Sequence, residues 1–157
     1  MVETAVGGAA DVIRSDALAF TLASGSDGFV ERANINRDAG EAGLNGNDLN
    51  NTLIGNSRDN LLIGFSGDDI LNGGGGSNAL FGGSGDDAFV VDTATDSVFE
   101  LGGGGTDLVR AESDFTLPEA AAAGLIENLR MQGGGAISTA PAMRSTTASR
   151  ATPGTIG

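Results

Sequence analysis

A nine-residue period runs through residues 46–90 and restricts the possible folds of the chain more than any other feature. Cut into nines, the stretch reads GNDLNNTLI, GNSRDNLLI, GFSGDDILN, GGGGSNALF and GGSGDDAFV. The first place is always glycine: Gly46, Gly55, Gly64, Gly73 and Gly82. The sixth is always Asn or Asp: Asn51, Asn60, Asp69, Asn78 and Asp87. The eighth is always large and apolar: Leu53, Leu62, Leu71, Leu80 and Phe89. Three coincident phases indicate a tandem repeat whose units stack.

Each block combines a turn with a very short strand. Glycine in the first six places suits a turn, and alternation along the last three places directs the eighth side chain inward. Two blocks then form one coil, and successive coils stack as parallel strands about 4.8 Å apart. The sequence therefore predicts an all-β parallel β-roll, a solenoid in which Leu53, Leu71 and Phe89 face Leu62 and Leu80. This core is too thin to stabilise the fold by hydrophobic burial alone.

Stacked coils bring sixth-place carboxylates together. Asp69 and Asp87 are expected to lie close to each other among turn carbonyls, where they repel unless a cation lies between them. Ligands that are all oxygen suit Ca²⁺ better than Mg²⁺, which requires stricter octahedral geometry. We therefore expect Ca²⁺ binding and folding to be linked. Fifth-place Asp68 and Asp86 are expected to be solvated turn residues.

The composition supports a cation as partner and disfavours several other functions. The chain has 157 residues, a formal net charge of −13, and neither Cys nor His. This charge disfavours nucleic acid and anionic membrane surfaces, and no apolar run is long enough for membrane insertion. Disulfides, thiolate or ordinary zinc sites and His-based catalytic triads are excluded. Met1 is not followed by the pattern of a cleaved signal peptide. We expect a binding protein and no enzyme activity.

A second, longer repeat flanks the nine-residue blocks. Residues 2–22 and 99–117 both run from Glu through a glycine-rich turn to Asp-(Val/Leu)-(Ile/Val)-Arg and then Phe-Thr-Leu. Each copy predicts short β-hairpin segments, although two unrelated hairpins are an alternative. The predicted organisation is a flanking β segment over 1–43 that ends a preceding long repeat, the β-roll over 44–92, and a second flanking β segment over 93–131. One helical turn is predicted after Pro118.

Two acidic residues occur at matching places in both copies of the longer repeat. Asp11 and Asp107 are expected to stabilise turns, and Glu31 and Glu127 are expected to be structural. The segment 132–157 loses the apolar phase and is rich in Ser, Thr, Ala and Arg. It is expected to be either a disordered tail or an out-of-frame read of a further repeat. The nucleotide sequence distinguishes these two alternatives.

The repeat blocks resemble the RTX (repeats-in-toxin) calcium-binding nonapeptide, G-G-x-G-x-D-x-U-x. The block at residues 82–90 matches every fixed position, the block at 64–72 departs only at Phe65, and the block at 73–81 has Asn78 in place of Asp. The resemblance extends over roughly residues 2–131. It implies a parallel β-roll with Ca²⁺ held between turns that are two blocks apart.

The resemblance also implies three sets of calcium ligands. In each set, the earlier turn supplies two carbonyls and a sixth-place side chain, and the later turn does the same. The best-supplied set is Phe65, Gly67 and Asp69 with Gly82, Ser84 and Asp87. The second set is Gly74, Gly76 and Asn78 with Val91, Thr93 and Asp96. The third and weakest set is Asn47, Leu49 and Asn51 with Gly64, Ser66 and Asp69.

Two functions follow from the resemblance. The first is a calcium-folded module of an extracellular or surface protein that leaves the cell by type I secretion and carries further RTX repeats in a longer parent chain. The second is the accessory part of a secreted RTX enzyme of the alginate epimerase, lipase or metalloprotease type, with its catalytic domain elsewhere. A disordered glycine-rich linker does not explain the phased apolar residues.

Overall fold

The computed structural model describes residues 12–15, 19–22, 32–35, 40–100, 105–117, 126–132 and 136–139. All regular structure within these ranges is β-strand. None of the described residues forms a helix that is long and apolar enough to cross a membrane. The helical turn predicted after Pro118 lies outside the described residues.

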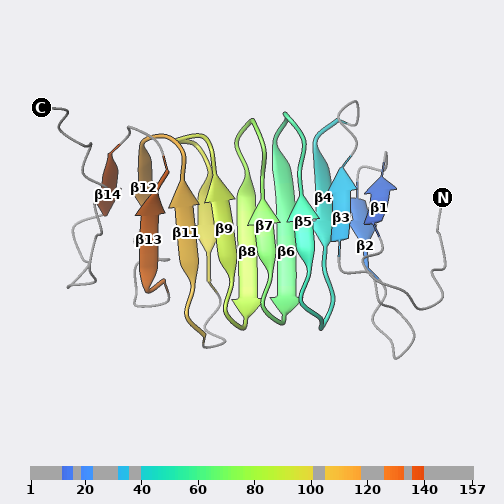
Figure 1. Ribbon diagram of the computed structural model, residues 1–157. Coiled ribbons are helices and arrows are strands. Elements are labelled where there is room, and N and C mark those ends of the chain that lie inside the picture. The colour runs from blue at the N-terminus through green and yellow to red at the C-terminus, as the bar shows by residue number, and fades with distance from the viewer. Residues whose placement is uncertain are drawn as a thin grey trace, which may run out of the picture.

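The strands form two main sheets whose pairings are all parallel, with a small third sheet at one end (Figure 1). The seven-stranded sheet has the order β1 (Val12–Ser15), β3 (Arg32–Ile35), β5 (Thr52–Ile54), β7 (Ile70–Asn72), β9 (Ala88–Val91), β11 (Leu108–Ala111), β13 (Asn128–Met131). The five-stranded sheet has the order β10 (Ser97–Phe99), β8 (Ala79–Ser84), β6 (Asn60–Ser66), β4 (Ala42–Asn45), β2 (Ala19–Thr21). The third sheet pairs β12 (Phe115–Leu117) with β14 (Ile137–Thr139).

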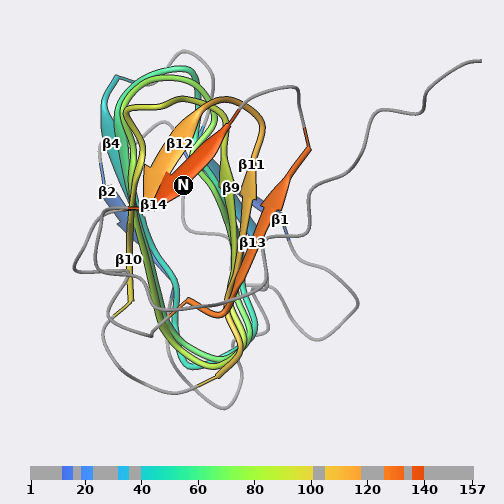
Figure 2. The same ribbon diagram turned by 90° about the vertical axis from the view of Figure 1, so that its left-hand side faces the viewer.

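The chain alternates between the two main sheets, so each coil gives one strand to each. Along the roll axis, the two sheets face each other and turns join them at both ends (Figure 2). Leu53 pairs with Leu71 and Leu71 with Phe89, which is the register of an 18-residue coil. The predicted parallel β-roll is confirmed.

The core lies between the sheets, and across the nine-residue repeat it is built from the eighth-place side chains. All five predicted residues are fully buried: Leu53, Leu62, Leu71, Leu80 and Phe89. The seventh-place residues Leu61 and Ile70 are 42 % and 46 % exposed, as alternation along a short strand requires. Each coil contributes two inward side chains here, so the glycine turns must be stabilised by interactions other than apolar packing.

The flanking segments differ from the predicted hairpins. The strands β1, β3, β11 and β13 pair in parallel with the roll and extend its seven-stranded sheet. Leu108 lies opposite Ala88, so the coil there is 20 residues long instead of 18. The physical reason is that a longer turn absorbs two residues while the strand continues to cover the sheet edge, which a separate hairpin would leave open.

Part of the segment predicted as a tail forms a strand. Residues 137–139 form β14, which pairs with β12 in the register Phe115 to Ile137. The remainder of the tail after residue 139 lies outside the described residues. The prediction of disorder does not hold for residues 137–139. Whether residues 140–157 are disordered or out of frame stays a prediction.

Candidate metal centre

One edge of the roll carries a row of polar side chains, each immediately before a strand of the seven-stranded sheet, and all but Glu127 are buried. We name this row the inner acidic row, and it consists of Asn51, Asp69, Asp87, Asp107 and Glu127. The backbone N–H of each residue donates a hydrogen bond to the side-chain oxygen of the next member. The N···O distances are 2.7 Å for Asn51 to Asp69, 2.8 Å for Asp69 to Asp87, 2.8 Å for Asp87 to Asp107 and 2.9 Å for Asp107 to Glu127. Each bond uses one carboxylate oxygen.

The second oxygen of the central acids has no partner. Asp69 Oδ2 and Asp87 Oδ2 are buried and accept no hydrogen bond, and both residues are only 1 % exposed. Burial, which outweighs the lowering effect of the Asn51 N–H and is reinforced by the charge of Asp87, raises the pKa of Asp69 to about 8. Burial likewise raises the pKa of Asp87 to about 6. An unpaired buried carboxylate is costly, and a bound cation removes that cost.

The best-supplied predicted set is brought together beside these oxygens. Phe65 lies opposite Gly83, and Gly67 N–H donates to the Ser84 carbonyl at 2.8 Å. A side-chain carbon at Gly64 would collide with Asp69 Oδ2 and lie 2.6 Å from the Gly82 carbonyl oxygen. Asp69 Oδ2, which accepts no hydrogen bond, and the Gly82 carbonyl oxygen therefore converge on one space, which is the chemistry of a Ca²⁺ ligand set.

The backbone around this set has the conformation that close stacking requires. Gly67, Gly83 and Gly85 have φ of 100°, 121° and 122°. Side-chain carbons at Gly83 and Gly85 would collide with the Phe65 and Gly67 carbonyls of the coil before. Glycine here permits both the positive φ and the approach of one turn to the next.

The second predicted set is also brought together, at the opposite edge of the roll, but its oxygens already have donors. The Asn78 amide nitrogen donates to the Gly74 carbonyl at 3.0 Å and to Asp96 Oδ1 at 2.9 Å. The Thr93 hydroxyl donates to the Gly76 carbonyl at 2.8 Å, and the Val91 carbonyl accepts from Glu112 N–H. Amide and hydroxyl groups thus occupy positions that a cation holds in the resemblance. This set stays a prediction.

The third set has one carboxylate. The Asn47 carbonyl accepts from Ser66 N–H at 3.4 Å, and Asn51 Oδ1 accepts from Asn47 N–H at 2.8 Å. The Asn51 N–H donates to Asp69, and a side-chain carbon at Gly67 would lie 2.7 Å from the carbonyl carbon of exposed Leu49. Gly64 lies beside Asp69 Oδ2. With Asn51 in place of an acid, this set has less negative charge than the first.

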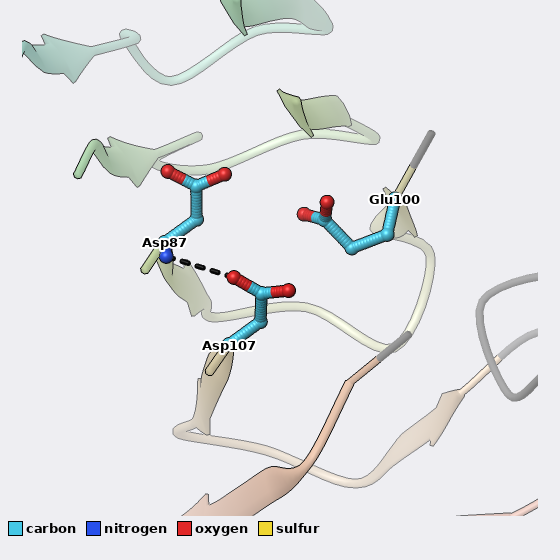
Figure 3. Close-up of side chains that lie close together, drawn as sticks. All are labelled: Asp87, Glu100 and Asp107. Atoms are coloured by element: carbon cyan, nitrogen blue, oxygen red, sulfur yellow. Dashed lines mark hydrogen bonds between the residues drawn. The ribbon is translucent and has the colours of Figure 1, made fainter. Parts of the chain in front are cut away.

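Two residues that the sequence did not predict as ligands join Asp87. One ligand atom from each of Asp87, Glu100 and Asp107 lies within 4.8 Å of the others, and all three residues are buried (Figure 3). Burial, together with the negative charges on Asp107 and Asp87, raises the pKa of Glu100 to about 8. Burial also raises the pKa of Asp107. The spacing along the sequence could have indicated Glu100. It lies 18 residues, or one full coil, after Gly82, at a position that corresponds to the first place of a block.

The sequence predicted that the fifth-place acids are solvated turn residues, and in the structure they also accept hydrogen bonds from the next coil. Asp68 and Asp86 are exposed, but Asp68 Oδ1 accepts from Asp86 N–H at 3.0 Å and Asp86 Oδ1 accepts from Thr106 N–H at 2.7 Å. Asn50 Oδ1 accepts from Asp68 N–H in the same manner. We name Asn50, Asp68 and Asp86 the outer row. Stacked turns place these oxygens over the next backbone amide, which the linear sequence did not indicate.

The comparisons with known proteins agree with this geometry in the centre of the chain. A family model described as the RTX calcium-binding nonapeptide repeat (4 copies) matches residues 45–80 and residues 64–98. Neither the comparison with curated proteins nor the comparison with solved structures gives a match. The matched residues contain the inner acidic row from Asn51 to Asp87 and the whole of the second predicted set.

Proposed function

Because residues 45–98 are RTX calcium-binding nonapeptide repeats, we propose that this chain is a Ca²⁺-dependent folding module with a binding and structural role and no catalytic activity of its own. The observation that carries the proposal is the pair of buried, unpartnered oxygens Asp69 Oδ2 and Asp87 Oδ2. Without a cation, the carboxylates destabilise the stacked turns. With Ca²⁺ between the turns, the same carboxylates join one coil to the next.

Circular dichroism of the full chain tests this proposal, since the chain has neither Trp nor Tyr for fluorescence. We expect a spectrum of low order in chelator and a β-rich spectrum when Ca²⁺ is added, with Mg²⁺ much less effective because of its octahedral requirement. A spectrum that is identical in chelator and in excess Ca²⁺ would refute calcium-dependent folding.

A matched pair of variants locates the effect. Asp69→Asn retains an oxygen that can accept the Asn51 N–H but removes the charge, so we expect the Ca²⁺ midpoint of folding to rise by about tenfold or more. Asp48→Asn removes one charge from an exposed turn residue and is expected to leave the midpoint unchanged. Equal midpoints for the two variants would exclude Asp69 as a ligand.

We further propose that the module belongs to a protein that is exported by type I secretion and folds outside the cell. Extracellular calcium modules bind Ca²⁺ with Kd of about 10⁻⁴ to 10⁻³ M, so the chain would stay unfolded at cytosolic Ca²⁺ and fold outside. The net charge of −13 supports this, because self-repulsion opposes compaction until cations bind. A folding midpoint in the micromolar range or below would contradict this part of the proposal.

A further inference from the structure

The buried cluster of Asp87, Glu100 and Asp107 lies where the repeat pattern changes. Phe99 pairs with Phe81, so Glu100 follows in register beside Gly82, and Leu108 pairs with Ala88, so Asp107 lies beside Asp87. At this coil the period lengthens from 18 to 20 residues and a glutamate replaces the first-place glycine. The cluster is therefore composed differently from the nonapeptide sets described above.

The oxygens of this cluster point at one another. A side-chain carbon at Gly82 would collide with both Asp87 Oδ2 and Glu100 Oε1, so these two oxygens converge on the space that Gly82 leaves open. Figure 3 shows the side chain of Glu100, the residue that follows β10, extending toward Asp87 and Asp107. Asp107 Oδ1 accepts from Asp87 N–H, which fixes its carboxylate at the same place.

Two of the converging oxygens have no partner. Asp87 Oδ2 and Glu100 Oε1 are buried and accept no hydrogen bond, and their residues are 1 % and 8 % exposed. Within the described ranges, the charges that act on these carboxyls come from other acids, and no arginine ion-pairs with them. Each of the three acids accepts one backbone N–H, but among the described residues no positive charge balances them and no donor reaches Asp87 Oδ2 or Glu100 Oε1. In the second predicted set, by contrast, amide and hydroxyl groups donate to the oxygens.

The turn stack also continues across the lengthened coil. A side-chain carbon at Gly105 would collide with the Gly85 carbonyl, as one at Gly85 would with the Gly67 carbonyl. Gly105 has φ of 133°, close to the 122° of Gly85. The extra two residues thus leave the close approach of successive turns intact.

We propose that Asp87, Glu100 and Asp107 form an additional Ca²⁺ site, in which the Glu100 side chain supplies a ligand where the nonapeptide pattern has only glycine. The proposal deepens the proposed function and rests on it. Three carboxylates without His or Cys select a hard cation, and the buried space suits the flexible coordination of Ca²⁺ better than the octahedral demands of Mg²⁺. Because affinity rises with the number of charged ligands, this site binds Ca²⁺ more tightly than the Asp69–Asp87 set.

Glu100 is the residue to change, because it belongs to this site alone, whereas Asp87 also belongs to the first set. Isothermal titration of Ca²⁺ into the chelator-stripped full chain measures the number of sites and their affinities. We expect Glu100→Gln to lose the tightest site, or to weaken it by about tenfold or more, while the other sites remain. Glu41→Gln, which removes the same charge from an exposed position, is the control and is expected to match the unmodified chain.

The outcomes separate this inference from the proposed function. If the unmodified chain binds Ca²⁺ and folds, but Glu100→Gln has the same number of sites and the same affinities, the additional site is refuted and calcium-dependent folding stands. If the unmodified chain binds no Ca²⁺, both fail. Should Glu100→Gln not fold in excess Ca²⁺, Asp107→Asn replaces it, since its amide oxygen can still accept from Asp87 N–H. Unchanged binding by that variant would equally overturn the site.

Discussion

Phe65 has a backbone conformation that glycine adopts in the next coil. Its φ is 83°, and it lies opposite Gly83, whose φ is 121°. A side chain in the left-handed region costs roughly 1–2 kcal/mol, and Phe65 recovers little by packing because it is 48 % exposed. The strain arises from the single departure of this block from the repeat pattern.

We predict that glycine is preferred to alanine at position 65. Phe65→Gly is expected to be about 1 kcal/mol more stable than Phe65→Ala, because alanine retains the strain and glycine removes it. Thermal unfolding in saturating Ca²⁺, followed by circular dichroism, measures the difference. Ala79, within β8, is the control position. There alanine is expected to be more stable than glycine, so that Ala79→Gly is less stable than the unmodified chain. Equal stability of the two variants at position 65 would contradict the strain.

Two glycines should respond in opposite ways to a methyl group. Gly85→Ala is expected to lower the free energy of unfolding by at least about 1–3 kcal/mol, because φ is 122° there and the new carbon would collide with the Gly67 carbonyl. Gly75→Ala should be neutral or stabilising by about 0.4–1 kcal/mol, because its nearest neighbour is Ser57 Cα at an ordinary 3.5 Å. Denaturant unfolding in Ca²⁺ tests both, and equal losses would refute a special role for Gly85.

Between elements, the outer row joins consecutive turns in addition to the sheet pairing. Asp68 accepts from Asp86 N–H and, through its own N–H, donates to Asn50 Oδ1. We predict that Asp68→Ala loses about 1 kcal/mol and that Asp68→Asn, which retains an acceptor, loses much less. Hydrogen exchange of the Asp86 amide gives a local readout. Exchange that is equally slow in Asp68→Ala and in the unmodified chain would show that this bond protects nothing.

The central strands were predictable and the flanking ones only in part, for a physical reason. Where the period is 18, glycine, Asx and apolar phases coincide, and strands such as β7 follow from the sequence. In the flanks the turns are longer, so the glycine phase fails and a hairpin was predicted. The remaining signal is an acid followed by an apolar residue two places later, as in Asp107-Leu108-Val109. That pattern also marks the strand after Glu127, and it depends on the strand rather than on the turn.

Ligand geometry was less predictable than strand positions. The Asp69–Asp87 set follows from the repeat, but Glu100 occupies a glycine place and reaches Asp87 only because the coils stack. Likewise, whether Asn78 binds a cation or donates to Asp96 depends on three-dimensional contacts. Periodicity specifies which residues become neighbours. It does not specify which of their oxygens already have donors.

For the whole molecule, stability should depend on pH in opposite directions with and without Ca²⁺. Burial raises the pKa of Asp69 from 3.8 to about 8, of Asp87 from 3.8 to about 6 and of Glu100 from 4.5 to about 8. Between the ordinary and the raised pKa values, the folded chain holds more protons than the unfolded chain, so its free energy of unfolding falls as pH rises.

We therefore predict that the Ca²⁺-free chain loses stability from about pH 5 to about pH 8, a range above its isoelectric point of about 4.1. In saturating Ca²⁺ the trend should reverse, because the ligands must be deprotonated to bind the ion. Thermal melts at several pH values in chelator and in Ca²⁺ measure both slopes. Parallel slopes in the two conditions would contradict a role for these carboxylates in binding.

The inner acidic row gives the roll a polarity. The N–H groups of Asp69 and Asp87 in this row donate to the coil that follows, whereas the N–H groups of Asp68 and Asp86 in the exposed outer row donate to the coil that precedes. Loss of a later coil therefore removes the acceptor of an inner-row N–H, whereas loss of an earlier coil removes the acceptor of an outer-row N–H. The two rows thus point in opposite directions along the roll. Shortening the array from the C-terminal side should speed hydrogen exchange of the inner-row amide at the cut, and shortening it from the N-terminal side should speed exchange of the outer-row amide there.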